Sequence, residues 1–400
     1  MRPYRLLVLS SHPIQYQAPV HRALAAHPAI DLTVLFCSEW GVKSYRDPGF
    51  GRDVQWDVPL LDGYRSTFLR NWSLRPGLNR FWGLLNPGVV RWIVNQHYDA
   101  VLVYGWSRAT NLMAIGAAFA TNMPVLLRGE TNLLNSLSSF KKGLKSAVLK
   151  PLFAATSGFL SIGRHNSEFY GAWGVPMQKI HLAPYSVDNE YWLAQATKFS
   201  GHKSQLKCDL GFGPGTPIIL FSGKLISMKR PLDLLQAFES VSKKLPSGLV
   251  FLGDGQLRGQ LEAYVRDRRL TNVKFVGFKN QTELAPYFAM SDVFVLPSGF
   301  EPWGLVLNEA LCFGLPVIAS DKVGATGDLV QHGINGFVYS AGDVAALTAR
   351  LEELLGNPTL RHSAGQASGK LIQKWGIPQI VEGVLECLRR VVGSRTEVAA

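Results

Sequence analysis

Short apolar runs that alternate with amphipathic stretches constrain this chain more than any other feature. Several runs are apolar throughout, as at residues 100–104 and 293–297. A strand has such a sequence when both faces of its sheet are covered. Helices between successive strands imply that the strands pair in parallel. The candidate strands are residues 5–10, 31–36, 99–104, 123–128, 157–162, 217–222, 248–253, 273–276, 292–296 and 315–319. The pattern predicts an α/β fold with open, wound sheets.

A polar, Gly/Pro-rich stretch over residues 197–217 divides the chain, and a new apolar run begins directly after it. A length of 400 residues fits two or three domains at about 150 residues each. Because linkers have this composition, we predict two α/β domains, residues 1–195 and 196–376.

Composition excludes several classes of protein. With 47% hydrophobic and 18% charged residues, the chain is neither disordered nor collagen-like. Its 4 cysteines lie far apart, which fits a reducing compartment and argues against a disulfide scaffold or a cysteine zinc site. No secretion signal is evident, and no apolar run reaches the ~18 residues of a membrane span. These features predict a cytoplasmic protein.

The net charge of +12 indicates an anionic partner, whether phosphate, lipid headgroups or nucleic acid. Charge alone does not choose among these partners. The basic residues are not interleaved with aromatic residues in a recognition motif, so we expect no nucleic-acid binding.

The most informative segment runs from residue 297 to residue 320 and contains Glu301 and Glu309. A buried strand ends at its start, and a helix is predicted from about residue 304 to residue 313. Loops at the carboxyl ends of parallel strands bind ligands, and the amides of Gly304 and Leu305 would face an anion. One carboxylate could then contact a sugar and the other a ribose diol. The alternative is a loop glutamate and a helix-surface glutamate without a shared role.

A basic loop follows the candidate strand 217–222 and contains Gly223, Lys224, Lys229 and Arg230. Departure of a diphosphate leaving group develops negative charge that such cations stabilise. No Asp-x-Asp motif occurs in the chain, so we expect no metal. The alternative is a solvated basic loop.

The sequence pattern from Glu301 to Glu309, together with the turn at residues 314–318, resembles the signature of glycosyltransferase family 4. The likeness covers residues 155–345. The resemblance implies a GT-B architecture, in which two Rossmann-like domains face each other across a cleft and a final helix, about 377–392, returns to the N-terminal domain. It also implies a retaining hexosyltransferase-like enzyme that needs neither cofactor nor metal.

The same resemblance implies that the second domain binds the donor, a UDP- or GDP-sugar. Glu309 is then the ribose contact, Glu301 meets the donor sugar or the reacting face, and Phe278 lies near the base. The family usually has arginine at the position of Lys224 and glycine at that of Arg230.

Polar residues after the strands of the first domain predict the acceptor side. His12 and Gln15 follow the first strand, and Trp106 follows the strand at 99–104. Glu130 occupies the position of a family histidine that touches the donor sugar, and Arg128 precedes it. We therefore predict catalytic roles for His12, Glu130 and Glu301, and acceptor-side roles for Gln15, Trp106 and Arg128.

Residues 140–153 are basic and apolar at helical spacing, which fits either docking on anionic lipid or a solvated helix face. The family setting is assembly of cell-surface glycan, exopolysaccharide or lipopolysaccharide at the inner face of the cell membrane, on a hydroxyl acceptor such as a lipid-linked glycan. Two other functions stay open: a nucleotide-sugar epimerase on a similar fold, and a non-catalytic protein that binds sugar nucleotides.

Overall fold

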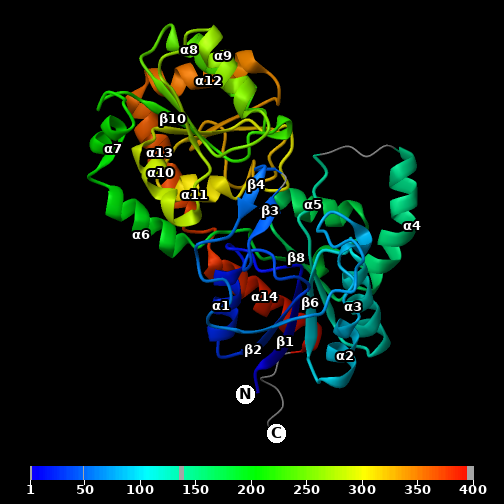
Figure 1. The fold of residues 1–400 in the computed structure, drawn as a ribbon. Helices are drawn as coiled ribbons and strands as arrows, with labels where there is room; N and C mark the ends of the chain where they lie inside the picture. The colour runs from blue at the N-terminus through cyan, green and yellow to red at the C-terminus, as the bar shows by residue number, and fades with distance from the viewer. Residues whose placement is uncertain (1, 48, 135–138, 394–400) are drawn as a thin grey trace. The chain divides into compact units, whose positions relative to one another are not determined.

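The computed structural model describes residues 2–47, 49–134 and 139–393, with backbone alone for residues 139–146. The chain forms two compact units (Figure 1). The first comprises Met1–Tyr45, Val58–Tyr185 and Ile377–Ala400, and the second comprises Arg46–Asp57 and Ser186–Gly376. The chain thus changes unit at Ser186 rather than at residue 196. Residues 46–57 belong to the second unit although the first domain was expected to contain them.

A seven-stranded sheet in the order β5-β2-β1-β6-β7-β8-β9 forms the first unit, and all its strand pairs are parallel. Its strands are β1 (Tyr4–Ser10), β2 (Ile30–Phe36), β5 (Arg65–Phe68), β6 (Ala100–Tyr104), β7 (Val125–Arg128), β8 (Gly158–Ser161) and β9 (Ile180–Leu182). The chain builds outward from β1, first through β2 to β5 and then through β6 to β9. The strand order therefore reverses between β1 and β6.

Strand β1 shows why its sequence is apolar throughout. Leu7 and Leu9 enter the hydrophobic core on one face of the sheet, whereas Leu6 and Val8 enter the core on the other face. Side chains alternate across a strand, so burial on both faces requires an unbroken apolar run. The helices of this unit are α1 (Ala18–Ala26), α2 (Gly88–Asn95), α3 (Ala109–Ala120), α4 (Ser139–Ala155), α5 (Arg164–Ala172) and α14 (Ile377–Val392).

Helix α14 has the bounds expected for the final helix. It packs against α1, β8 and β9 of the first unit. Its apolar side chains, among them Val384, Leu385 and Leu388, complete the same core as Leu6 and Val8.

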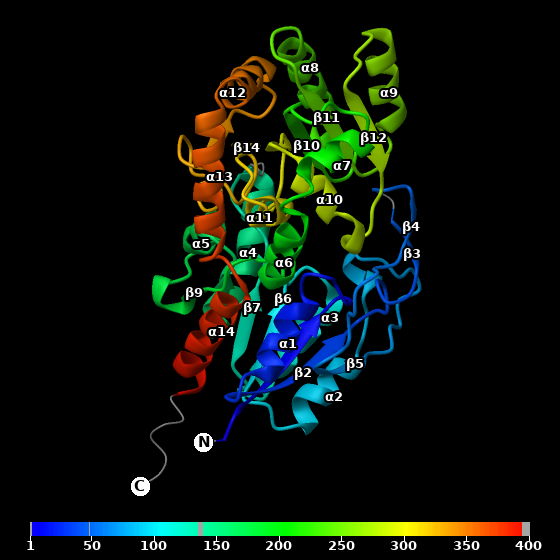
Figure 2. The ribbon, with the colours of Figure 1, turned by 90° about the vertical axis from the view of Figure 1, so that its left-hand side faces the viewer.

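The second unit is built on a six-stranded parallel sheet in the order β12-β11-β10-β13-β14-β15. Its strands are β10 (Ile218–Ser222), β11 (Gly248–Leu252), β12 (Val273–Gly277), β13 (Val293–Leu296), β14 (Val317–Ser320) and β15 (Gly336–Tyr339). Its helices are α6 (Asn189–Phe199), α7 (Lys203–Asp209), α8 (Pro231–Ser242), α9 (Arg258–Asp267), α10 (Ala285–Met290), α11 (Val306–Cys312), α12 (Val344–Gly356) and α13 (Pro358–Ile372). Helices α8 and α12 lie side by side over one face of the sheet (Figure 2). This strand order is that of the Rossmann fold.

The predicted fold class is confirmed, and each candidate strand is present. The structure adds β3 (Tyr45–Asp47), β4 (Arg52–Val54), β5, β9 and β15. These are short strands at sheet edges or in a separate two-stranded sheet, β3-β4, and several carry exposed polar side chains. No helix in the described part of the chain is long and apolar enough to cross a membrane.

Candidate active site

The strand order of the second unit places its candidate site between β10 and β13. The chain leaves β10 toward β11 on one side, and the sheet continues with β13 on the other. Ligands of open α/β sheets bind where the order reverses in this way, outside the carboxyl ends of the strands. The basic loop follows β10, and the loop containing Glu301 follows β13. Sheet topology therefore brings the two strongest sequence motifs to the same place.

Lys229 and Glu301 form an ion pair that links these two loops. Their side chains are only 19% and 10% exposed. Burial, and to a smaller degree the charge of Lys224, lower the pKa of Lys229 to about 8. Ser298 donates a hydrogen bond from Oγ to Glu301 Oε1 over 3.3 Å. The pairing sets a desolvated cation and a carboxylate side by side at the switch point, which neither motif predicted alone.

Lys224 is bound by Asp47, a residue that the sequence interpretation missed. The Nζ atom lies 2.9 and 3.0 Å from the two carboxylate oxygens of Asp47 and 4.8 Å from the ring centre of Phe50. Burial opposes ionisation of Asp47, but hydrogen bonds from Lys224 and from the amides of Phe50 and Gly49 outweigh it and lower its pKa. A carboxylate thus pairs with the lysine that is predicted to bind the diphosphate.

Phe278 follows β12, and its ring is covered by residues 46–57. The Phe50 ring meets it edge-on at 4.8 Å, and the guanidinium carbon of Arg52 lies 4.9 Å from its centre. The same segment accepts hydrogen bonds from Asn280 at the carbonyl of Gln55 and from Thr282 at the carboxylate of Asp57. Phe278 is therefore a packed aromatic residue here rather than an open platform for a base.

Arg230 stands at a backbone position with φ +50°, between the lysine loop and α8. Left-handed backbone favours glycine, which explains why the family usually has glycine there. The guanidinium Nε donates to Asp233 Oδ2 over 2.7 Å. Gly223 lies directly after β10, at the start of the same loop.

Glu309 lies on α11, whose first helical residue is Val306 rather than Gly304. Leu305 caps the helix, and Gly304 adopts φ +99°, where a Cβ would also lie 2.9 Å from Leu296. Among the described residues, the Glu309 carboxylate has no hydrogen-bond or ion-pair partner. Burial raises its pKa to about 8. An unpartnered acid in the first turn of a helix is suited to accept hydrogen bonds from a polar ligand.

The first unit has its own switch point between β1 and β6. Burial and the charge of Arg108 lower the pKa of His12 to about 4, so this imidazole is neutral at pH 7. Gln15 in the same loop has a buried Oε1 with no described partner. Trp106 follows β6 but packs on Phe153 and Phe169, at centroid distances of 5.2 and 6.1 Å. Of the predicted acceptor-side residues, Gln15 thus has a polar atom available, whereas Trp106 belongs to an aromatic cluster.

Glu130 is exposed two residues beyond β7 and accepts a 2.6 Å hydrogen bond at Oε1 from the Tyr185 hydroxyl. The Tyr185 ring meets Tyr16 edge-on at 5.7 Å. Arg128, which we expected beside Glu130, is buried and donates to the carbonyls of Ala183 and Pro184 over 2.6 and 3.3 Å. Glu130 thus has a tyrosine partner that sequence spacing did not reveal.

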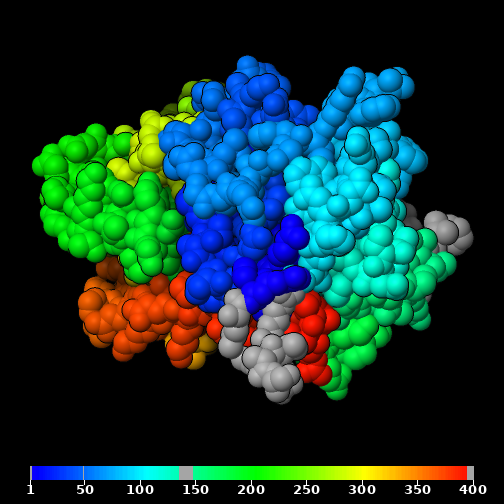
Figure 3. Space-filling model, turned by 90° about the horizontal axis from the view of Figure 1, so that it is seen from below, coloured from blue at the N-terminus to red at the C-terminus, as the bar shows by residue number. Residues whose placement is uncertain are grey.

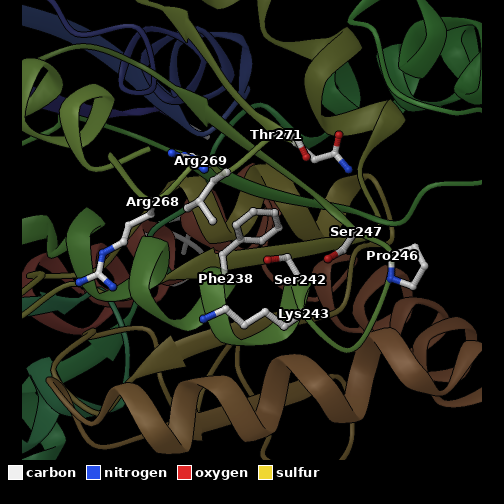
Figure 4. A pocket seen from close by; sticks show the side chains of 10 residues that line it. Phe238, Ser242, Lys243, Pro246, Ser247, Arg268, Arg269 and Thr271 are labelled. Carbon is white, nitrogen blue, oxygen red and sulfur yellow. The ribbon is translucent and has the colours of Figure 1, made fainter. Parts of the chain in front are cut away.

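Two further observations bear on ligands. In the part of the chain that the structure describes, no three His, Cys, Asp or Glu side chains gather as a metal site would require. A hollow of about 270 Å³ opens in the second unit near the residues that precede β11 and β12, at the amino edge of the sheet (Figure 4). It contains none of the predicted site residues and lies at the edge opposite the switch point.

Comparison with known proteins identifies a domain within the second unit. Residues 203–371 match the family model for glycosyl transferases group 1. The chain carries the domain of the group 1 glycosyl transferases. Lys224, Lys229, Glu301 and Glu309 all fall inside the matched stretch. The resemblance is confirmed at this level, whereas family 4 and retention stay predictions.

Individual relatives agree with this family. A sulfoquinovosyl transferase from Arabidopsis thaliana is 34% identical over 289 residues, which make up 71% of this chain and 53% of that protein. The chain spans about half the length of the curated relatives it matches.

Solved structures share the GT-B fold. HepE from Anabaena, solved with UDP and glucose, has a TM-score of 0.70 at 17% identity and covers 96% of this chain and 99% of its own. The lipopolysaccharide outer core galactosyltransferase WaaB, solved in the apo form, has a TM-score of 0.67 at 15% identity, with coverage of 96% and 99%. At these identities the likeness shows the fold alone.

Proposed function

We propose that this chain transfers a sugar from a nucleoside diphosphate sugar to an acceptor hydroxyl, with retention and without a metal ion. The observation that carries the proposal is the Lys229–Glu301 pair between β10 and β13 of a group 1 glycosyl transferase domain. A preorganised cation stabilises the charge that develops on the leaving diphosphate. Glu301 accepts hydrogen bonds from the donor sugar, and Glu309 accepts them from the ribose.

Retention in this proposal follows attack on the same face of the sugar. The bond from the anomeric carbon to the phosphate oxygen breaks, and the acceptor oxygen bonds to that carbon from the side that the diphosphate leaves. The departing phosphate oxygen takes the acceptor proton. His12, neutral at pH 7, and Glu130 belong to the acceptor side of this scheme.

The choice of donor and pathway is based on the descriptions of two structural neighbours. HepE was solved with UDP and glucose, and WaaB is described as a lipopolysaccharide galactosyltransferase. The UDP bound to HepE favours a UDP-sugar over a GDP-sugar. The description of WaaB favours a role in lipopolysaccharide or related polysaccharide assembly. The proposed acceptor is a lipid-linked glycan at the inner face of the cell membrane.

A thermal-shift panel of UDP-, GDP- and ADP-sugars in EDTA tests the proposal, because a ligand that binds only the native state raises the melting temperature. The bound donor is then incubated with and without a glycan acceptor. We expect nucleotide release to need the acceptor and to persist in EDTA. An epimerised donor formed without acceptor would instead establish the epimerase. Binding without turnover on any acceptor would favour a binding protein.

Replacing Glu309 by glutamine should stabilise the empty protein while weakening nucleotide binding. An acid whose pKa is raised to about 8 in the folded protein costs stability once the unfolded chain ionises, above about pH 4.5. The melting temperature of the variant should therefore exceed that of wild type by a margin that grows from pH 5 to pH 8 and then levels. Loss of the ribose contact should weaken UDP or GDP binding about 10-fold or more.

Glu190, exposed on α6, provides the matched control. Glu190→Gln should change neither the melting temperature nor the affinity for UDP or GDP. A Glu309→Gln protein that melts below wild type at pH 8 would show that the carboxylate is structural instead.

Replacing Asp47 by asparagine should strengthen nucleotide diphosphate binding. Asparagine keeps an oxygen for the amides of Gly49 and Phe50 but no longer neutralises Lys224. Because the lysine is one-third exposed, we expect only about 3- to 5-fold tighter binding by calorimetry. Asp57→Asn, a change in the same segment that does not touch Lys224, should leave affinity unaltered. Unchanged affinity in Asp47→Asn would mean that Lys224 only anchors residues 46–57.

A further inference from the structure

The loop between β5 and α2 exposes large apolar side chains. Leu74 is 99% exposed, Trp82 65%, Trp72 62% and Phe81 41%. We refer to residues 70–82 as the arginine–aromatic loop. Exposed tryptophans gathered in one short segment indicate a binding surface rather than the scattered exposure of ordinary surfaces.

The backbone of the arginine–aromatic loop is fixed by hydrogen bonds. The amide of Trp72 donates to the carbonyl of Leu85 over 2.8 Å, and the amide of Gly77 donates to the carbonyl of Gly83 over 3.2 Å. A Cβ on Gly83 would lie 2.0 Å from the carbonyl oxygen of Gly77, so the two segments approach too closely for a side chain there. Leu84 behind them is fully buried. The loop therefore holds its aromatic side chains outward, while Leu84, which follows the loop, fills the core.

The stretch of sequence that contains these side chains carries charge of one sign. Residues 63–98 contain no aspartate or glutamate, and their Lys/Arg residues are Arg65, Arg70, Arg75, Arg80 and Arg91. Arg65 pairs with Asp31, but Arg70, Arg75 and Arg80 are exposed and form no ion pair with any residue that the structure describes. The Arg70 guanidinium carbon lies 5.5 Å from the ring centre of Trp72. Tryptophan beside unpaired arginine is the combination that anionic membrane interfaces attract.

The arginine–aromatic loop also adjoins the switch point of the first unit. It starts just beyond the carboxyl end of β5, where the amide of Leu69 donates to the carbonyl of Phe36 at the end of β2. The carbonyl of Leu78 accepts a hydrogen bond from Arg108, the residue whose charge acts on His12. Figure 3 shows the light-blue part of the chain, which includes this loop, at the molecular surface. A surface that binds this loop would lie next to the proposed acceptor side.

We propose that the arginine–aromatic loop docks the first unit on an anionic lipid bilayer. Trp72, Leu74 and Trp82 enter the interface, and Arg75 and Arg80 meet the lipid phosphates. The site is distinct from residues 140–153, of which the structure describes side chains only from residue 147 onward. This proposal depends on the proposed function only for the purpose of docking, which would bring a lipid-linked acceptor beside His12. Bilayer binding itself needs no donor.

Vesicle sedimentation tests this proposal. We expect the full chain to bind vesicles of phosphatidylcholine with about a quarter phosphatidylglycerol, to bind pure phosphatidylcholine weakly, and to lose binding at high salt. Arg75→Ser with Arg80→Ser should lower the partition coefficient about 10- to 30-fold. Trp72→Ser with Trp82→Ser should lower it at least as much, because interfacial anchoring also depends on buried apolar area.

Matched variants separate the competing explanations. Lys141→Ser with Lys142→Ser, in the segment 140–153, should leave vesicle binding unchanged. All variants should keep the circular dichroism of wild type and its nucleotide-induced melting shift, so failure of docking and failure of the proposed function are told apart. Wild-type vesicle binding by the tryptophan variant would overturn the proposal. So would a concentration-dependent dimer that this variant abolishes, since the loop would then bind a second copy.

Discussion

Replacing Lys229 by methionine should weaken UDP or GDP binding about 10- to 100-fold, the scale of a charge-assisted hydrogen bond. Lys229 is largely buried, and a desolvated cation interacts with a phosphate more strongly than an exposed one. Methionine retains the length of the side chain, so the loss isolates the charge. Isothermal titration calorimetry of the empty protein measures the effect without any acceptor.

The pair with Glu301 adds a second expected result. Removal of Lys229 leaves the buried carboxylate of Glu301 without this cation, so the melting temperature of the single variant should fall. Changing Glu301 to glutamine in the same protein should restore much of this stability but not nucleotide binding. Recovery of both the melting temperature and the nucleotide affinity in the double variant would show that the single variant acted through misfolding. Equal nucleotide affinity in wild type and Lys229→Met would remove the lysine from the donor site.

This pair also shows what the sequence could and could not predict. The loops after 217–222 and 292–296 were recognisable because apolar runs locate the carboxyl ends of buried strands. Lys229 and Glu301 were therefore both predicted as site residues. Their contact depends on β13 lying next to β10, although β11 and β12 intervene in the chain. Strand order is a tertiary property that periodicity does not contain.

The position of residues 46–57 in the second unit was even harder to predict from the sequence. Their strands β3 and β4 have three residues each and partly exposed side chains, so they carry almost no periodic signal. Their attachment to the second unit depends on contacts such as Asp47 with Lys224, far away in sequence. The same reason explains why Asp47 was missed and why the contacts of Phe278 with Phe50 and Arg52 were not foreseen. By contrast, the family resemblance implied α14 at about residues 377–392, and the structure has the helix at those bounds.

Glu130→Gln should leave nucleotide binding intact and slow sugar transfer at least about 100-fold. A group that acts mainly in the transition state lowers kcat when it is removed, with little change in donor affinity. The carboxylate is exposed, and one oxygen accepts from the Tyr185 hydroxyl at 2.6 Å. Burial and the negative charge of Glu130 hold the pKa of Tyr185 well above its usual range, so this tyrosine remains a donor at neutral pH.

Tyr185→Phe is the informative companion to Glu130→Gln, because it removes the hydrogen bond and keeps the charge. If the carboxylate acts on the sugar, Tyr185→Phe should lower kcat far less than Glu130→Gln does. The double variant should then have a kcat only slightly below that of Glu130→Gln alone. Circular dichroism and the nucleotide-induced melting shift verify that each variant is folded. Near-native kcat in folded Glu130→Gln would return the chemistry to Glu301, since a histidine with pKa about 4, as at His12, is a weak base at neutral pH.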